Sequence, residues 1–145
     1  MKNLLLLQIQ FLSLKNCLNK FVVLSKTKKL LKKLSDLRKL VNGSPRKKLV
    51  LAAAQDNSSL GAVLRAWKDG IIEPQLVGDR EAILTIASAY GYDLKGLNII
   101  HEPENQNAME VAVKMVSSKQ AEILMKGKVG TSSLLKCVLN KEWGL

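Results

Sequence analysis

The sequence has few aromatic residues, only two cysteines and a single histidine. Phe, Trp and Tyr together make up 4% of the chain, whereas its 47% hydrophobic content is mostly Leu, Ala, Val and Ile. This composition favours helices packed on a sheet over a sandwich rich in Tyr and Trp. Cys17 and Cys137 lie far apart, and His101 cannot complete a zinc set with them. We therefore expect neither a metal site nor a disulfide bond, and a reducing cytoplasm is the simplest setting.

Acidic residues are almost absent from the first third of the chain. Residues 1–48 hold 13 Lys/Arg against the single acid Asp36, and residues 49–145 hold 10 Lys/Arg against 11 Asp/Glu, so the net charge is 12 − 1 = +11. The basic character therefore belongs to an N-terminal extension, and the remainder is nearly neutral. A charge run of this kind is usually a solvated face, so the net charge says little about what the folded part binds.

The first 14 residues superficially resemble a signal sequence, with one early lysine and an apolar run. They lack the small-residue cleavage pattern, and polar residues interrupt any stretch long enough to span a bilayer. Leu and Lys then interleave, with Leu30 and Leu34 recurring at helical spacing. We predict an amphipathic helix that ends at Asn42-Gly43, and an interfacial position at a membrane is the alternative.

From Lys48 onward, short apolar strands alternate with helices of about ten residues. The predicted strands recur at roughly the spacing of a βα unit and cover residues 49–53, 75–77, 97–100 and 122–125. The expected N-caps of the helices are Asp79, Thr131 and either Asn105 or Asn107. The expected helix ends are Gly70 and Gly91. Parallel strands joined by right-handed crossovers give an α/β fold, a parallel sheet with helices on both faces.

Each predicted helix has an apolar face that we expect to pack on this sheet. In chain order the four faces consist of Leu60, Val63, Leu64 and Trp67; Ile83, Ile86, Ala87 and Tyr90; Met109, Ala112, Val113 and Val116; and Leu134, Leu135, Val138 and Leu139.

Ligands of such sheets bind beyond the carboxyl ends of the strands, where loops meet helix N-termini with unpaired amides and partial positive charge. The loop after the last strand, within residues 125–135, places two lysines, two glycines and three hydroxyls at the entry to a helix. This composition suits a phosphate or an acyl phosphate. The loop is neither a Walker A loop nor a G-x-G-x-x-G turn, and a simple connection with a Thr cap is the alternative.

The loop after the first strand is the second candidate. Small residues stand where the chain leaves the sheet, and Gln55, Asp56 and Asn57 follow them. Small residues allow a bulky ligand to approach, and the polar trio is able to hydrogen-bond it. Tight helix–sheet packing followed by an Asx cap explains the same residues equally well.

Four segments of the sequence resemble the phosphate acetyl/butyryltransferase family in order and spacing. They read KKLVLAAAQD at 47–56, GIIEPQLVGDREAI at 70–83, IIHEP at 99–103 and AEILMKGKVGTSSLLKCVLNKEWGL at 121–145. The resemblance is closest to the phosphate butyryltransferase branch, in which the methionine-lysine-glycine loop is typical, and it covers the N-terminal half of such an enzyme only.

The resemblance implies a three-layer, isocitrate/isopropylmalate dehydrogenase-like fold with two α/β domains and an active site in the cleft between them. Residues 1–45 are then a basic Leu/Lys-rich helical extension. Residues 46–145 are the first α/β domain, truncated before the second domain. That second domain carries most of the family's CoA site and its acid-base residue, so the catalytic residue of this chain is unknown and its activity alone is in question.

The implied activity is reversible transfer of a short acyl group, butyryl or acetyl, between CoA and inorganic phosphate. Acyl-CoA, inorganic phosphate and acyl phosphate are the expected partners, with no tightly bound cofactor, a cytoplasmic location and a possible homodimer. Such an enzyme chiefly orients its substrates and stabilises developing oxyanion charge. The residues assigned to phosphate or carbonyl oxygen by this resemblance are Lys126, Gly127, Gly130, Thr131 and Ser132, with Gln55 and Asp56 on the rim of the cleft.

A different class of function is a non-catalytic module whose basic N-terminal extension binds nucleic acid or an anionic membrane surface. No aromatic platform or recognition motif supports it, so we rank it below the acyltransferase and expect neither nucleic acid nor membrane as the main partner. A degenerate fragment with no activity is the third possibility.

Overall fold

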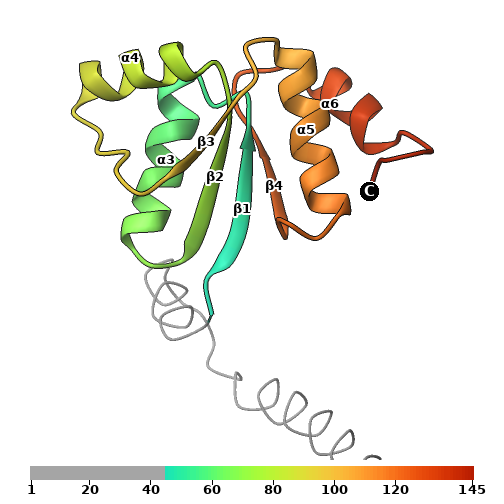
Figure 1. The fold of residues 1–145 in the computed structure, drawn as a ribbon, viewed down its shortest axis with the longest axis horizontal. Helices are drawn as coiled ribbons and strands as arrows, with labels where there is room; N and C mark the ends of the chain where they lie inside the picture. The colour runs from blue at the N-terminus through green and yellow to red at the C-terminus, as the bar shows by residue number, and fades with distance from the viewer. Residues whose placement is uncertain (1–44) are drawn as a thin grey trace, which may run out of the picture. The chain divides into compact units, whose positions relative to one another are not determined.

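The structure, a computed structural model, describes residues 45–145. The helical extension predicted for residues 1–45 therefore lies outside the described residues, apart from its last residue. Strands and helices alternate throughout the described part (Figure 1). In chain order they are β1 Lys47–Ala52, α3 Asn57–Lys68, β2 Ile72–Gly78, α4 Arg80–Tyr90, β3 Asn98–His101, α5 Asn105–Ser117, β4 Ile123–Lys126 and α6 Thr131–Val138.

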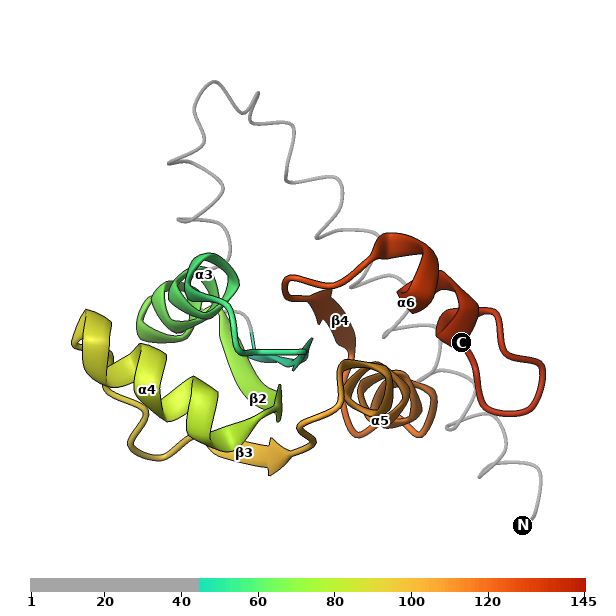
Figure 2. The same cartoon turned by 90° about the horizontal axis from the view of Figure 1, so that it is seen from above.

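The four strands form one sheet in the order β3-β2-β1-β4, and every neighbouring pair is parallel. Helices α3 and α4 cover one face of the sheet, and α5 and α6 lie on the other side (Figure 2). The predicted α/β fold with a parallel sheet and helices on both faces is thus confirmed.

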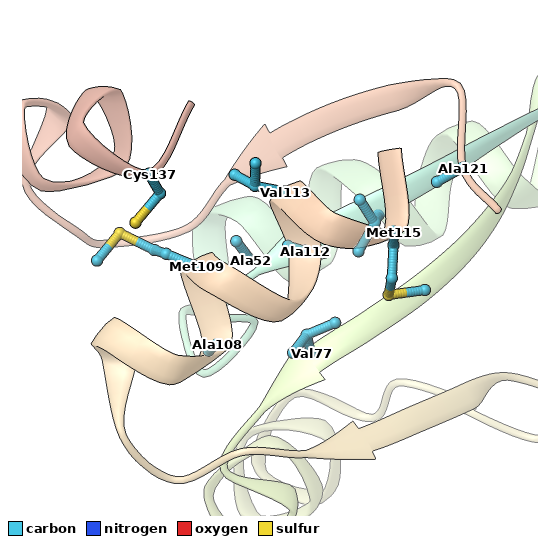
Figure 3. Packing of buried hydrophobic residues seen from close by; sticks show 10 residues of the cluster. Ala52, Val77, Ala108, Met109, Ala112, Val113, Met115, Ala121 and Cys137 are labelled. Carbon is cyan, nitrogen blue, oxygen red and sulfur yellow. The ribbon is translucent and has the colours of Figure 1, made fainter. Parts of the chain in front are cut away.

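Strand β1 separates two apolar cores because its side chains alternate between the faces of the sheet. Leu49 and Leu51 join the cluster under α3 and α4, whereas Val50 and Ala52 join the cluster under α5 and α6. Figure 3 shows the second cluster, in which the sulfur atoms of Met109 on α5 and Cys137 on α6 point toward one another. The Nε2–H of Gln106 also donates to the Cys137 sulfur at 3.4 Å.

Two of the predicted apolar faces are partly wrong. Tyr90, at the end of α4, is 57% exposed and stacks on Tyr92 with ring centroids 5.9 Å apart. Leu135 on α6 and Leu139 at its C-cap are exposed, and Cys137 is the buried residue instead. Residues two positions apart lie on nearly opposite sides of a helix, so turning Cys137 inward turns both leucines outward.

The predicted caps are confirmed for α4 and wrong for the last two helices. The Asp79 carboxylate accepts the amides of Glu81 and Ala82, and Gly91 ends α4 in the left-handed conformation. Helix α5 begins after Glu104 and α6 after Gly130, and neither cap makes a side-chain hydrogen bond. Asn105 and Thr131 are instead the first residues of these helices, and Asn107 lies further inside α5.

Strand β2 is longer than predicted because it accommodates Pro74. Proline lacks an amide donor and normally ends a central strand. Pairing between β2 and β3 begins only at Gln75 with Asn98, so at Pro74 no β3 residue stands opposite. Pro74 pairs with Leu49 of β1 on the other side. The N–H and C=O groups of one strand residue point to the same side of the strand, and the side alternates from each residue to the next. The carbonyl groups of Ile71 and Val77 accept hydrogen bonds on the β1 side, and that of Gly78 accepts one on the β3 side. The nitrogen of Pro74, four residues before Gly78, therefore points to the β3 side, where this part of β2 has no partner.

Candidate functional site

The strand order places a reversal between β1 and β4. The chain passes from β1 to β2 to β3 in one direction and then returns through α5 to β4 on the other side of β1. Helix α3 therefore leaves β1 on one side of the sheet, and α6 leaves β4 on the other (Figure 2). Ligands of open parallel sheets bind at such a reversal, outside the carboxyl ends of the strands. We use the name β1–β4 crevice for the two adjacent loops at this reversal, residues 53–56 after β1 and residues 127–130 after β4.

The two loops of the β1–β4 crevice touch at Gly127. Its N–H donates to the Ala52 carbonyl at 2.8 Å, and a Cβ at position 127 would overlap the Ala53 carbonyl oxygen. Ala53 itself has a φ of 54°, a left-handed conformation that costs a residue with a Cβ about 1 kcal/mol or more. Gly127 is thus required for close approach, and its amide is already engaged and not available to an anion.

Further along the loop, several amides lack an acceptor. Val129 donates to the Gly127 carbonyl at 2.9 Å, and the amide of Leu134 returns to the Gly130 carbonyl at 3.2 Å. Between them, no acceptor within residues 45–145 bonds to the backbone amides of Lys128, Gly130, Thr131, Ser132 and Ser133. The start of α6 therefore carries free donors and the positive end of the helix dipole.

The start of α4 is the opposite case, because side chains occupy its amides. Gln55 Oε1 accepts the Asp79 amide at 3.3 Å, and His101 Nδ1 accepts the Arg80 amide at 3.2 Å. The amides of the next two residues, Glu81 and Ala82, donate to the Asp79 carboxylate. The sequence indicated no such role for His101, although its position at the end of a predicted strand was the available signal. The loop after β2 is consequently closed to an anion.

Two lysines lie at the β1–β4 crevice. Lys126 Nζ donates to the Val129 carbonyl at 3.1 Å, which holds this ammonium group over its own loop. Lys128 lies near enough to the Asp56 carboxylate to contribute to lowering its pKa, although hydrogen bonds from Ser59 contribute most. Asp56 is the N-cap of α3, and its Oδ2 accepts the Ser59 amide at 2.9 Å and the Ser59 hydroxyl at 2.8 Å. The Asx-cap interpretation of Asp56 is therefore confirmed.

Gln55 joins three loops. Besides accepting the Asp79 amide, its Nε2–H donates to Asn105 Oδ1 at 2.8 Å. A Cβ at Gly78 would overlap the Gln55 amide oxygen. Gln55 thus connects the loops after β1, β2 and β3, and its amide faces those loops and not the lysine-bearing loop after β4.

The predicted site residues therefore separate into two groups. One group lies at the end of β4 and the start of α6 and consists of Lys126, Gly127, Gly130, Thr131 and Ser132. Asp56 lies on the other loop, after β1, where it caps α3. No group of three or more His, Cys, Asp or Glu side chains within residues 45–145 is arranged to hold a metal ion, and no helix in that part is long and apolar enough to cross a membrane.

A cavity of about 270 Å³ lies at the other end of the strands, where β2 and β3 begin. It is lined by Arg46, Trp67, Glu73, Pro74, Gln75, Gly96, Leu97 and Asn98. None of the predicted site residues contributes to it, so concavity and loop chemistry lie at opposite ends of the sheet. The free amides and lysines, which are the groups able to bind an anion, identify the β1–β4 crevice as the candidate site.

The architecture matches that of a solved structure. The fold is that of a phosphotransacetylase from Staphylococcus aureus, with a TM-score of 0.58 at 15% sequence identity over 74% of this chain and 43% of that one. No family model matches the sequence.

The particular family follows from sequence relatives. The chain is 40% identical over 116 residues to a phosphate butyryltransferase of Clostridium acetobutylicum, covering 80% of this chain and 38% of the relative. It is 39% identical over 99 residues to a phosphate acetyltransferase of Thermotoga maritima, covering 68% of this chain and 33% of the relative. Over the matched residues the chain belongs with the phosphate acetyl/butyryltransferase family, as the resemblance indicated. It spans about a third of the length of these relatives.

Proposed function

We propose that this chain supplies the phosphate-binding part of an acyltransferase that moves a butyryl or acetyl group between CoA and inorganic phosphate. The observation that carries the proposal is the set of free amides at the start of α6, which lie beside Lys126 and Lys128 at the reversal between β1 and β4. Relatives named for this activity support the chemistry. CoA and acyl-CoA act as substrates, and acyl phosphate is the product.

In this function the loop after β4 orients phosphate for attack on the thioester. The amides of Gly130, Thr131 and Ser132 donate to phosphate oxygens, and the hydroxyls of Thr131 and Ser132 fix their orientation. Lys126 leaves the Val129 carbonyl and neutralises charge on the phosphate or on the carbonyl oxygen as it develops in the transition state. Gly127 permits the loop to lie directly against β1.

The same proposal includes the domain plan. Residues 46–145 are the first α/β domain of the enzyme, residues 1–45 are an extension, and the residues that bind CoA belong to the part of the relatives that this chain does not span. The enzyme acts in the cytoplasm, without a tightly bound cofactor, as a homodimer.

A segment exchange tests the function. Residues 46–145 replace the matching segment of the Clostridium acetobutylicum phosphate butyryltransferase, and CoA release from butyryl-CoA is followed in the presence of phosphate. We expect phosphate-dependent CoA release, with Lys126→Ala lowering the rate about a hundredfold, as loss of one oxyanion donor does in other enzymes. Lys95→Ala is the matched control, because this exposed lysine precedes β3 at the far end of the sheet.

Two results would count against the proposal. A folded exchange protein that releases no CoA would contradict the acyltransferase function of this segment. An active exchange protein in which Lys126→Ala and Lys95→Ala behave alike would contradict the role given to the loop after β4.

A further inference from the structure

Asp56 places a carboxylate at the edge of the proposed anion site. It follows the end of β1, and the loop that carries Lys128 packs against this end through the hydrogen bond from the Gly127 amide to the Ala52 carbonyl. Its Oδ2 accepts both the amide and the hydroxyl of Ser59, whereas no donor within residues 45–145 bonds to Oδ1. One oxygen is thus fixed by the start of α3, and the second keeps its lone pairs for a ligand.

This carboxylate stays ionised near neutral pH. Hydrogen bonds from Ser59 hold its pKa below the ordinary value, and Lys128 lowers it further. A fixed negative charge opposes binding of any anion beside it. The opposition is removed only for an anion that still carries a proton, because such an anion donates a hydrogen bond to the carboxylate.

We propose that Asp56 makes the β1–β4 crevice selective for phosphate over anions of similar shape that have no proton, with Oδ1 accepting a P–OH hydrogen. This role rests on the proposed function, since it assumes that the loop after β4 binds phosphate. Both protonation states of inorganic phosphate near neutral pH keep at least one P–OH group, whereas sulfate keeps none. A sulfate oxygen would face Oδ1 with no hydrogen between them, and selectivity then arises from repulsion of the wrong ligand.

The experiment uses the full chain of 145 residues, isotope-labelled for NMR. Sodium phosphate and sodium sulfate are titrated separately near neutral pH at constant ionic strength, and the amide signals of residues 130–133 report on the site. We expect phosphate to bind the wild-type chain at least about tenfold more tightly than sulfate. Phosphate gains a hydrogen bond to Oδ1, whereas a sulfate oxygen is repelled by it.

Asp56→Asn is the informative variant. Asn serves as an N-cap as well as Asp does, so its side-chain oxygen keeps the hydrogen bond from the Ser59 amide. Its NH₂ group, however, is a donor at the position where Oδ1 of Asp56 is an acceptor. We expect this change to bring the two affinities to within about twofold, mainly by tightening sulfate. Asp79→Asn is the matched control, because Asp79 caps α4 in the same way and lies at the closed loop after β2. It should leave the ratio of the two affinities unchanged.

The possible results separate this inference from the proposed function. Equal binding of both anions by the wild-type chain would overturn selectivity by Asp56 and leave the anion loop in place. The same would follow if Asp56→Asn changed both affinities by one factor, since the carboxylate would then act only through its charge. If neither anion moved the signals of residues 130–133 in the wild-type chain, both the anion loop and the role of Asp56 would be contradicted.

Discussion

At the scale of single residues, Gly127 is the position where the site depends most directly on close packing. A Cβ there would overlap the Ala53 carbonyl oxygen and lie 3.0 Å from the Ala53 carbonyl carbon. Both atoms belong to the backbone at the exit of buried β1, which cannot move without breaking the sheet. We expect Gly127→Ala to lower the free energy of unfolding by about 2 to 3 kcal/mol in urea denaturation.

Gly130→Ala is the matched control for this prediction. A Cβ at Gly130 would meet only the hydroxyl oxygens of Ser133 and Ser132, at 3.6 and 3.9 Å, and its φ of −62° suits any residue. The variant should lose no more than about 1 kcal/mol, the cost of alanine at an N-cap. Equal losses from the two variants would show that contact with Ala53 does not determine the need for glycine.

The carboxylate of Asp56 also makes a prediction about acid stability. Hydrogen bonds from Ser59 lower its pKa in the folded chain. A lowered pKa means that its contribution to stability is present above the unfolded pKa and is lost as the pH falls below about 4. Since Asn keeps the cap without titrating there, wild type should lose stability relative to Asp56→Asn as the pH falls from about 5 to about 3. Urea denaturation of both proteins over this pH range measures the difference in their free energies of unfolding. Parallel pH profiles would contradict the prediction.

At the scale of elements, Gln55 connects three βα loops through one amide group. Gln55→Ala removes the acceptor of the Asp79 amide and the donor to Asn105, and we expect a loss of about 1 to 2 kcal/mol. Gln55→Glu keeps an acceptor for Asp79, and its second oxygen accepts from the Asn105 amide once that group turns over. Hydrogen exchange at the Asp79 amide should therefore be fast in Gln55→Ala and slow in Gln55→Glu. Protection of this amide in both variants would mean that Gln55 does not hold the loops together.

The sequence predicted the elements well and their ends less well, for physical reasons. Apolar periodicity and the Asp79 cap are local properties, so the strands, helices and the start of α4 were confirmed. Asn105 was wrong as a cap because its side chain bonds to Gln55, which is distant in sequence. Cys137 faces inward because α5 packs beside α6, and this orientation depends on tertiary contacts that spacing alone does not fix.

At the scale of the whole molecule, charge is divided between the parts of the chain. Residues 1–45 hold 10 Lys/Arg and one acid, so removing them changes the net charge from +11 to 11 − 9 = +2. We expect the full chain to bind heparin with a steep dependence on salt, and residues 46–145 to bind it weakly or not at all. Elution from a heparin column measures the difference, with circular dichroism as the check that residues 46–145 remain folded. Equal retention of the two proteins would show that residues 46–145 bind heparin and that the extension is not needed.

The position of the β1–β4 crevice was beyond prediction from the sequence for a reason that also belongs to this scale. Repeated βα units predict parallel strands, but they leave open whether β4 follows β3 or returns to β1. The loops that carry Lys126 and Asp56 are neighbours only because Ala52 pairs with Lys126. The sequence allowed candidate residues to be named on each loop, whereas the proximity of the two loops depends on strand order.

The order β3-β2-β1-β4 has a consequence for biosynthesis. Among the described strands, the inner strand β1 is translated first and its partner β4 last. Until Ile123–Lys126 has left the ribosome, Val50 and Ala52 lack their neighbour on that side, and the nascent chain exposes an unpaired, apolar strand edge. Slow translation or premature arrest in this interval would therefore favour aggregation and capture by chaperones over productive folding.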